Sequence, residues 1–179
     1  MSGPHFVAVG GTLRADSTTA RALRAALDFA EAHGATTTLL TGLAINLPPY
    51  EPERPERSDM AARLVAELRR ADAVIVGSPG YHGGISGLVK NALDYVEDMR
   101  GDERCYFDGL PVGCIATAAG WQAAVATLVQ IRSVVHALRG WPTPLGVAIN
   151  TVGGGDPIAA EAVQGQLKAM VEQQLAFLR

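Results

Sequence analysis

The sequence predicts a single domain of the α/β class, built on an open, doubly wound sheet of five parallel strands with helices on both faces. Three observations lead to this prediction. Short apolar, β-prone runs alternate along the chain with longer segments of helical periodicity, which is typical of βαβ units. The apolar runs are nearly continuous, as expected of parallel strands that are covered on both sides. The length of 179 residues suits one domain with its own core.

The first three elements follow from the residue pattern near the N-terminus. The run "HFVAVG" (residues 5–10) predicts a first strand. Alanine and leucine then recur at helical spacing, which predicts a helix over residues 18–33 with Gly34 as its C-terminal cap. The β-prone run "ATTTLLTG" (residues 35–42) predicts a second strand.

A proline-rich segment comes next. The run "NLPPYEPERPERSD" (residues 46–59) can form neither a helix nor a central strand, so we expect a surface loop there. A helix over residues 59–71, with Ser58 as its N-cap, then leads into "ADAVIVGSP" (residues 71–79), the third strand.

The second half of the chain continues the alternation. We expect a helix, a strand, a helix, a strand and a closing helix, over residues 86–100, 110–118, 121–138, 143–150 and 157–178. Right-handed crossovers would bring all five strands into one parallel sheet.

Composition and charge exclude several classes of protein. The hydrophobic fraction of 48% and the charged fraction of 18% are those of a globular protein, not of a disordered one. The net charge of −3, with both signs interspersed, leaves no basic surface for nucleic acid. No apolar run approaches the about 20 residues of a membrane span, and we see no signal peptide and no metal site. Cys105 and Cys114 lie in unlike contexts, so we expect no disulfide and a cytoplasmic location.

The place to look for a ligand follows from the fold class. In an open α/β sheet, ligands bind outside the carboxyl ends of the strands, near the point where the strand order reverses. The loops there are residues 10–18, 78–86 and 117–121.

The first of these loops has the chemistry of an anion site. It lacks both the P-loop pattern and the Gly-x-Gly-x-x-Gly pattern of dinucleotide folds. At a strand-to-helix junction, however, free backbone N–H groups and the helix dipole favour an anion, and short hydroxyls can complete its coordination. A terminal phosphate monoester fits this better than a pyrophosphate. The candidate residues are Thr12, Arg14, Ser17, Thr18 and Thr19.

A plainer interpretation of the first loop stays open at this point. Ser17, Thr18 and Thr19 could simply cap the following helix. Arg14 favours a ligand, because Asp16 is the only acidic residue near it in the loop.

The second loop is suited to a planar ligand. In "SPGYHGGISG" (residues 78–87), four glycines and a proline surround Tyr81 and His82. Glycines let the backbone approach a flat ligand closely, and the backbone N–H groups can bind its heteroatoms. No nucleophile lies near His82, so we assign it a contact and predict no catalytic side chain.

A longer segment around this loop closely resembles the NADPH-dependent FMN reductase family. The family pattern is Ser/Thr-Pro-x-Tyr-x-Gly, then Gly, two apolar residues and Lys-Asn-Ala-Leu-Asp. It is matched within residues 77–96 by Ser78, Pro79, Tyr81, Gly83, Gly87, Lys90, Asn91, Ala92, Leu93 and Asp94. The resemblance extends over essentially the whole chain. It implies a single flavodoxin-like, FMN-binding domain over residues 1–179, with strand order 2-1-3-4-5.

The resemblance also implies how FMN would bind. The phosphate would lie in the first loop, on Thr12, Arg14, Ser17, Thr18 and Thr19. The isoalloxazine ring would lie against Pro79, Gly80, Tyr81, His82 and Gly83, and the third loop would close over its other edge through Thr117, Ala118 and Gly120. NADPH or NADH would supply a hydride, and a second acceptor would take the electrons.

The sequence leaves the acceptor open. It could be free flavin for a partner monooxygenase, or a quinone, azo compound or metal oxyanion. A flavodoxin-like electron carrier without nicotinamide turnover is an alternative, although carriers are usually more acidic than −3. A flavin-free protein on the same fold is a further alternative.

Two helices bear on assembly. Residues 121–138 and 86–100 carry broader apolar faces than one core contact requires, unless both are simply buried in a thick core. We expect these helices to pair across a two-fold axis, as in the resembling family, giving a homodimer or a dimer of dimers.

Overall fold

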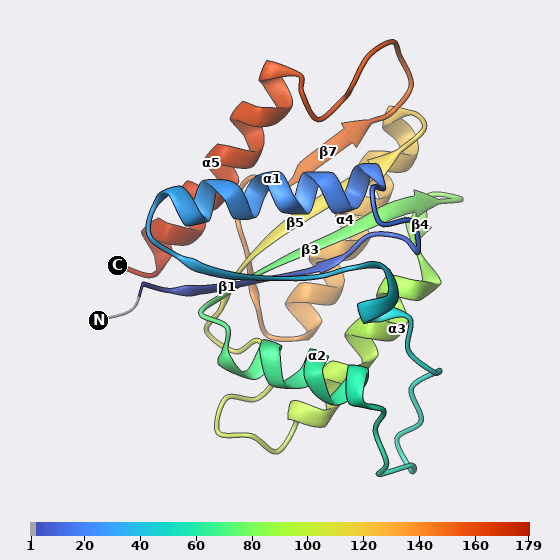
Figure 1. Cartoon of the computed structure of the whole chain (residues 1–179), viewed down its shortest axis with the longest axis vertical. Helices are drawn as coiled ribbons and strands as arrows, with labels where there is room; N and C mark the ends of the chain where they lie inside the picture. Colours follow the sequence, from blue (N-terminus) through green and yellow to red (C-terminus); the bar gives the residue numbers. More distant parts are fainter. Residues whose placement is uncertain (1–2) are drawn as a thin grey trace.

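The computed structural model describes residues 3–179 as one open α/β sheet with helices on both faces (Figure 1). Its elements follow in the order β1 (His5–Gly10), α1 (Thr18–Ala32), β2 (Thr36–Leu40), the 3₁₀ helix η1 (Gly42–Ile45), α2 (Asp59–Arg70), β3 (Ala73–Tyr81), β4 (Gly84–Ile85), α3 (Gly87–Asp94), the 3₁₀ helix η2 (Tyr95–Met99), β5 (Pro111–Ala118), α4 (Trp121–Ala137), β6 (Trp141–Pro142), β7 (Val147–Asn150) and α5 (Glu161–Phe177).

The sheet has the predicted strand order. Its parallel strands lie in the order β2-β1-β3-β5, and both β6 and β7 pair with the outer edge of β5. The five predicted strands correspond to β1, β2, β3, β5 and β7. Two short strands were not predicted: β6, and β4, which pairs antiparallel with the end of β3.

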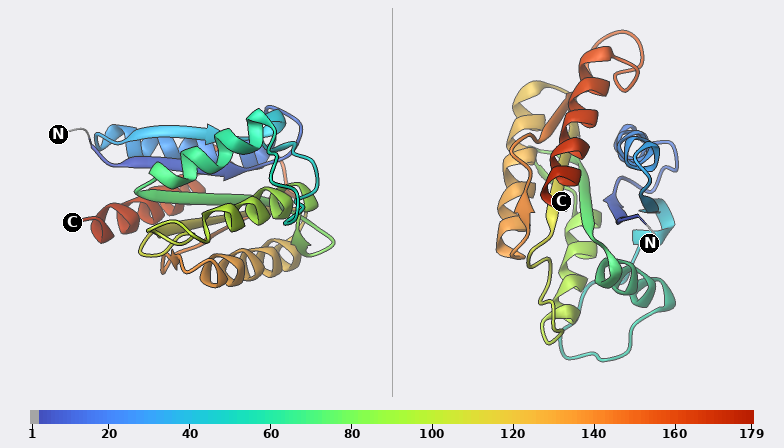
Figure 2. Two further views of the ribbon diagram at one scale, coloured as in Figure 1. Left: turned by 90° about the horizontal axis from the view of Figure 1, so that it is seen from below. Right: turned by 90° about the vertical axis from the view of Figure 1, so that its left-hand side faces the viewer.

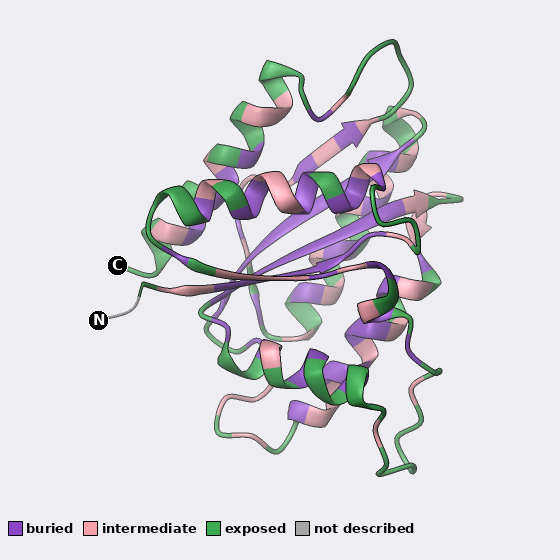
Figure 3. Ribbon diagram, viewed as in Figure 1, coloured by how far each residue is buried: buried purple, intermediate pink, exposed green. Residues whose placement is uncertain are grey.

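The two faces of the sheet are covered by different helices, because successive side chains of a strand point to opposite sides. Val7 belongs to the core that includes Leu64 of α2 and residues of α3 and α4. Its neighbour Phe6 belongs to the core formed with Leu27 of α1 and Met170 of α5. The views in Figure 2 show these layers, and Figure 3 shows the central strands β1, β3 and β5 largely buried between them.

The predicted helix ends are largely confirmed at α1 and α2. Ser58 caps α2, since its side chain accepts a hydrogen bond from the Ala61 backbone N–H at 3.3 Å. At the end of α1, the N–H of Gly34 donates to Glu31 O at 2.9 Å and that of Ala35 to Ala30 O at 3.1 Å. This pair of bonds is the Schellman pattern expected of a C-terminal glycine.

Three predicted boundaries are wrong by four residues or more, two of them because backbone groups are bonded elsewhere. Strand β7 begins at Val147, not at 143, since Thr143 turns its carbonyl toward Arg132 Nη1 at 2.6 Å. Helix α5 begins at Glu161, not at 157, since the N–H of Ile158 donates to the Asp156 carboxylate at 3.0 Å and favours a turn. The helix over residues 86–100 is α-helical only to Asp94 and continues as the 3₁₀ helix η2, a winding common at helix ends.

The carboxyl ends of the parallel strands all point to one edge of the molecule. Figure 1 shows both termini of the chain at the opposite edge, and the first view of Figure 2 agrees. Among residues 3–179, no helix is long and apolar enough to cross a membrane.

Candidate functional site

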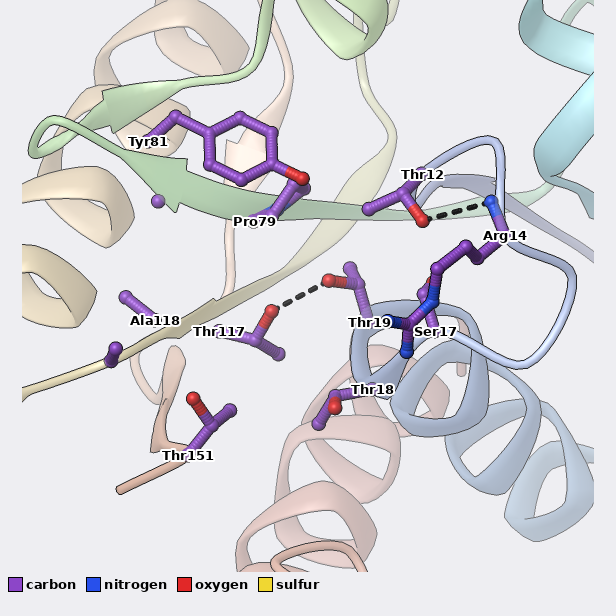
Figure 4. Close-up of a pocket in the computed structure, with 12 residues that line it drawn as sticks. Thr12, Arg14, Ser17, Thr18, Thr19, Pro79, Tyr81, Thr117, Ala118 and Thr151 are labelled. Atoms are coloured by element: carbon purple, nitrogen blue, oxygen red, sulfur yellow. Dashed lines mark hydrogen bonds between the residues drawn. The ribbon is translucent and has the colours of Figure 1, made fainter.

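A pocket of about 320 Å³ opens at the carboxyl edge of the sheet, where the sequence predicts a ligand (Figure 4). The loops after β1, β5 and β7, the start of α1 and the ends of β3 and β5 contribute to its walls. We call it the site pocket. It is lined by Thr12, Arg14, Ser17, Thr18, Thr19, Pro79, Gly80, Tyr81, Thr117, Ala118, Ala119 and Thr151.

The first loop delivers hydroxyl groups to the start of α1. The Ser17 side chain accepts a hydrogen bond from the Ala20 N–H at 3.2 Å and so caps the helix, while it also lines the pocket. Capping and lining are therefore compatible roles for this residue. The Thr12 hydroxyl accepts from the Arg14 N–H at 3.1 Å, which shapes the turn before the helix.

A buried hydroxyl pair joins two of the loops. The Thr19 and Thr117 Oγ1 atoms lie 2.6 Å apart, and both side chains are almost fully buried. One hydroxyl must donate to the other, so the second keeps its own hydrogen for a ligand in the pocket. The contact links α1 to the end of β5 across 98 positions of sequence.

Arg14 is the one positively charged side chain in this lining. It is exposed, and within residues 3–179 its guanidinium forms no ion pair, with Asp16 or with any other acid. No acidic side chain lines the pocket either, as far as the structure describes the chain. The N-terminus of α1 adds its partial positive charge, so this end of the pocket has the chemistry of an anion site.

The second loop forms a β-hairpin at the other end of the pocket. Strand β3 continues through Pro79 and Gly80 to Tyr81, and all three residues line the pocket. The Tyr81 side chain is 58% exposed, and Figure 4 shows it standing over this end of the site. His82 and Gly83 form the hairpin tip and lie outside the lining residues.

The third loop is tied to the loop after β7. Asn150 Oδ1 accepts from the backbone N–H groups of Gly120 and Val152, both at 2.9 Å. Gly120 precedes α4 and lies outside the lining, whereas Ala119 and Thr151 line the pocket and were not predicted. Thr151 could have been found, since it follows the last strand at the same carboxyl edge.

A second pocket of about 370 Å³, which we call the side pocket, adjoins the first. The two share Thr12, Arg14 and Tyr81. The remaining walls of the side pocket are Gly11, Leu13, Ser86 and Leu88, so much of its surface is apolar.

The Lys-Asn-Ala-Leu-Asp segment (residues 90–94) binds the proline-rich loop and does not line the site pocket. The Asn91 amide accepts from the Tyr50 N–H at 2.9 Å and donates to Pro48 O at 2.9 Å. Farther along, Arg57 donates to both oxygens of Asp98, at 2.7 and 2.8 Å. These hydrogen bonds hold the pKa of Asp98 below its ordinary value, against the opposing effect of partial burial. The segment therefore fastens residues 46–58 to α3 and η2.

The remaining titratable groups of interest lie away from the pocket. Cys105 and Cys114 are free thiols, and burial raises the pKa of Cys114 to about 12, which keeps it protonated. Among residues 3–179, no cluster of His, Cys, Asp or Glu is arranged to hold a metal ion.

The chain is similar to known proteins over most of its length. The model of a family described as NADPH-dependent FMN reductase matches residues 4–154. An FMN-dependent NADPH-azoreductase of Staphylococcus saprophyticus is 31% identical over 122 residues, which cover 65% of this chain and 61% of that protein. Another of that description, from Staphylococcus aureus, is 37% identical over 85 residues, 48% of this chain and 42% of that protein. The chain thus spans less than two thirds of these relatives.

Solved structures share the fold at low sequence identity. The flavoenzyme NAD(P)H:(acceptor) oxidoreductase FerB from Paracoccus denitrificans superposes with a TM-score of 0.78 at 20% identity, over 98% of this chain and 99% of that one. The flavodoxin-type WrbA-like protein of Agrobacterium tumefaciens gives a TM-score of 0.66 at 18% identity, over 98% of both chains. The predicted flavodoxin-like fold is confirmed.

Proposed function

Because the chain belongs to the NADPH-dependent FMN reductase family, we propose that it is an NAD(P)H-dependent oxidoreductase that binds FMN in the site pocket. The predicted family is thereby confirmed, and the description of the family names FMN and NADPH, the cofactor and co-substrate that the sequence predicts.

The observation that carries the proposal is the contrast between the two ends of the site pocket. One end combines Arg14, the start of α1 and a set of hydroxyls, with no acid among the described lining residues. The other end presents the backbone of Pro79 and Gly80 beneath an aromatic ring, that of Tyr81. This donor set fits a flat molecule that ends in a phosphate monoester, as FMN does.

Different residues would bind the two parts of FMN. Arg14 and the first-loop hydroxyls would bind the phosphate, and the hairpin backbone would orient the ring. FMN, when bound, supplies hydride and electron transfer between a nicotinamide and an acceptor. No side chain of the pocket is required as an acid or base, and the described lining residues include no Asp, Glu, His, Lys or Cys.

The side pocket is the proposed place for the second reactant. It shares Tyr81 with the site pocket, and Leu13 and Leu88 give it apolar walls suited to an aromatic molecule. Among the acceptors that the sequence leaves open, free flavin for a partner monooxygenase is the first candidate. Similarity to proteins described as azoreductases supports an azo compound as a second candidate.

A steady-state comparison of NADPH and NADH with FMN, FAD, a quinone and an azo dye tests this function. We expect the protein to bind FMN and to oxidise NADPH or NADH when an acceptor is supplied. FMN binding without nicotinamide oxidation would instead favour an electron carrier.

The exposed face of α4 supports a homodimer or a dimer of dimers. Trp121, Val125 and Val129 recur at a spacing of four along this helix, with 61%, 50% and 61% of each exposed. The predicted apolar face of residues 86–100 gives less support, since Val96 and Met99 are buried in the core. Sedimentation that shows only monomer would contradict this assembly. A cytoplasmic location is likewise proposed from the sequence.

A further inference from the structure

The hairpin at residues 80–85 is too short to hold its own shape. Gly80 pairs with Ile85 and Tyr81 with Gly84, and the turn between them has φ values of 53° at His82 and 77° at Gly83. Positive φ at both positions is typical of a tight two-residue hairpin turn. A hairpin with so few pairs is marginal in water unless other elements support it.

Gln130 of α4 supplies such support at the tip. Its Oε1 accepts from the Ile85 N–H at 3.3 Å, and its Nε2 donates to Gly83 O at 3.0 Å. One carboxamide thus bonds the turn, as donor, and the second arm of the hairpin, as acceptor. A primary amide provides both functions in one side chain.

Ser78 supplies a second attachment at the base. Its hydroxyl accepts from the Ser86 N–H at 3.0 Å and donates to Pro79 O at 2.9 Å, and the side chain is fully buried. The hairpin is therefore fastened at both ends, and Tyr81, which lines both pockets, lies between the two attachments.

We infer that Gln130 is a positioning residue for the flavin ring, acting through the hairpin and not through contact with the ligand. Gln130 is absent from the linings of both pockets. By fixing Gly83 and Ile85 it prepares the surface on which the ring is proposed to lie, so that less ordering must accompany binding. The inference rests on the proposed function, because that function places the ring on this hairpin.

The test compares FMN with riboflavin, which has the ring but no phosphate. We expect Gln130→Met to weaken both ligands by the same factor, about tenfold, the size of one to two net hydrogen bonds. Gln130→Glu keeps the acceptor for Ile85 and loses the donor to Gly83. Its affinity for both flavins should therefore lie between that of Gln130→Met and that of the native protein. Quenching of flavin fluorescence measures each affinity.

A second readout separates positioning from general stability. We expect Gln130→Met to shift the midpoint potential of bound FMN to more negative values, because a looser hairpin stabilises the reduced flavin less well. The matched control is Gln166→Met, since Gln166 is exposed on α5 and its side chain has no hydrogen-bond partner within residues 3–179. It should leave both affinities and the potential unchanged.

The outcomes distinguish the inference from the function on which it rests. If Gln130→Met leaves the riboflavin affinity and the midpoint potential unchanged, the inference is overturned and the proposed function still stands. The same holds if Gln130→Met loses affinity for FMN but not for riboflavin. A native protein that binds neither flavin would overturn the proposed function and the inference together.

Discussion

The two ends of the site pocket are held by the fold in different ways. At the first loop, Ser17 and Thr19 are 4% and 1% exposed, and their hydroxyls are bonded within the structure. At the hairpin, Tyr81 is 58% exposed and the turn projects into solvent. The start of α1 at the first end is packed into the core, whereas the hairpin is attached to the sheet by a few side chains.

The two ends should therefore differ in specificity and in adaptability toward a ligand. An anion site made from a helix start and buried hydroxyls is formed whenever the sheet is folded, so it should bind a phosphate without rearrangement. The hairpin has few buried contacts, and segments of that kind open at low free energy. We therefore expect changes in the first loop to affect folding or phosphate binding, and changes in the hairpin to affect the ring.

The largest effect is expected at Gly10, where β1 enters the first loop. Its φ is +144°, and a Cβ atom there would lie 1.8 Å from the backbone oxygen of Gly77 on β3. Gly10→Ala must therefore push two central strands apart, and we expect it to lower the free energy of unfolding by more than about 3 kcal/mol. Urea unfolding measures this loss.

Gly165→Ala is the control for this experiment. Gly165 lies within α5, and a Cβ atom there would meet nothing within 4 Å. Alanine should stabilise this position by up to about 1 kcal/mol through helix propensity. Equal stability of the native protein and Gly10→Ala would mean that the first loop is not embedded as described.

Arg14 gives the next largest effect, on binding instead of stability. Arg14→Ala removes the cation of the site pocket, and we expect FMN to bind about 10- to 100-fold more weakly, the value of a charge-assisted hydrogen bond. Riboflavin, which has no phosphate, should be affected less than about twofold, within the error of such comparisons. Isothermal titration of both ligands measures the difference.

Arg63→Ala serves as the control for Arg14, because Arg63 is exposed on α2 and lies outside the site pocket. It should leave both affinities unchanged. If Arg14→Ala loses affinity for FMN and for riboflavin by the same factor, the assignment of the phosphate to the first loop is wrong.

The contrast between the two ends also explains how much could be predicted from the sequence. The start of α1 was predictable, since a strand, a loop with hydroxyls and a helix pattern follow one another in the chain. The contact between Thr19 and Thr117 depends on the start of α1 reaching the end of β5, a strand that is not adjacent to β1, and only the structure reveals it.

At the hairpin, the loop residues could be predicted from the sequence, but their arrangement could not. The glycines of residues 78–87 indicated a tight backbone, yet not that His82 and Gly83 lie outside the lining of the site pocket. The support from Gln130 lies 45 and 47 positions away from its two partners, and nothing in the local pattern of α4 marks that residue.

Gly83 provides the smallest expected effect and the most direct comparison with Gly10. Both have positive φ, but a Cβ atom on Gly83 would meet nothing within 4 Å. Gly83→Ala therefore bears only the backbone penalty of a left-handed residue, about 1 kcal/mol. Because the turn lies at the ring end, part of that penalty should appear as weaker binding of riboflavin and FMN alike. Thermal unfolding and flavin titration of Gly83→Ala beside Gly10→Ala measure the two penalties. A loss of stability as large as that of Gly10→Ala would show that the hairpin is as firmly embedded as the first loop, and the distinction between the two ends would fail.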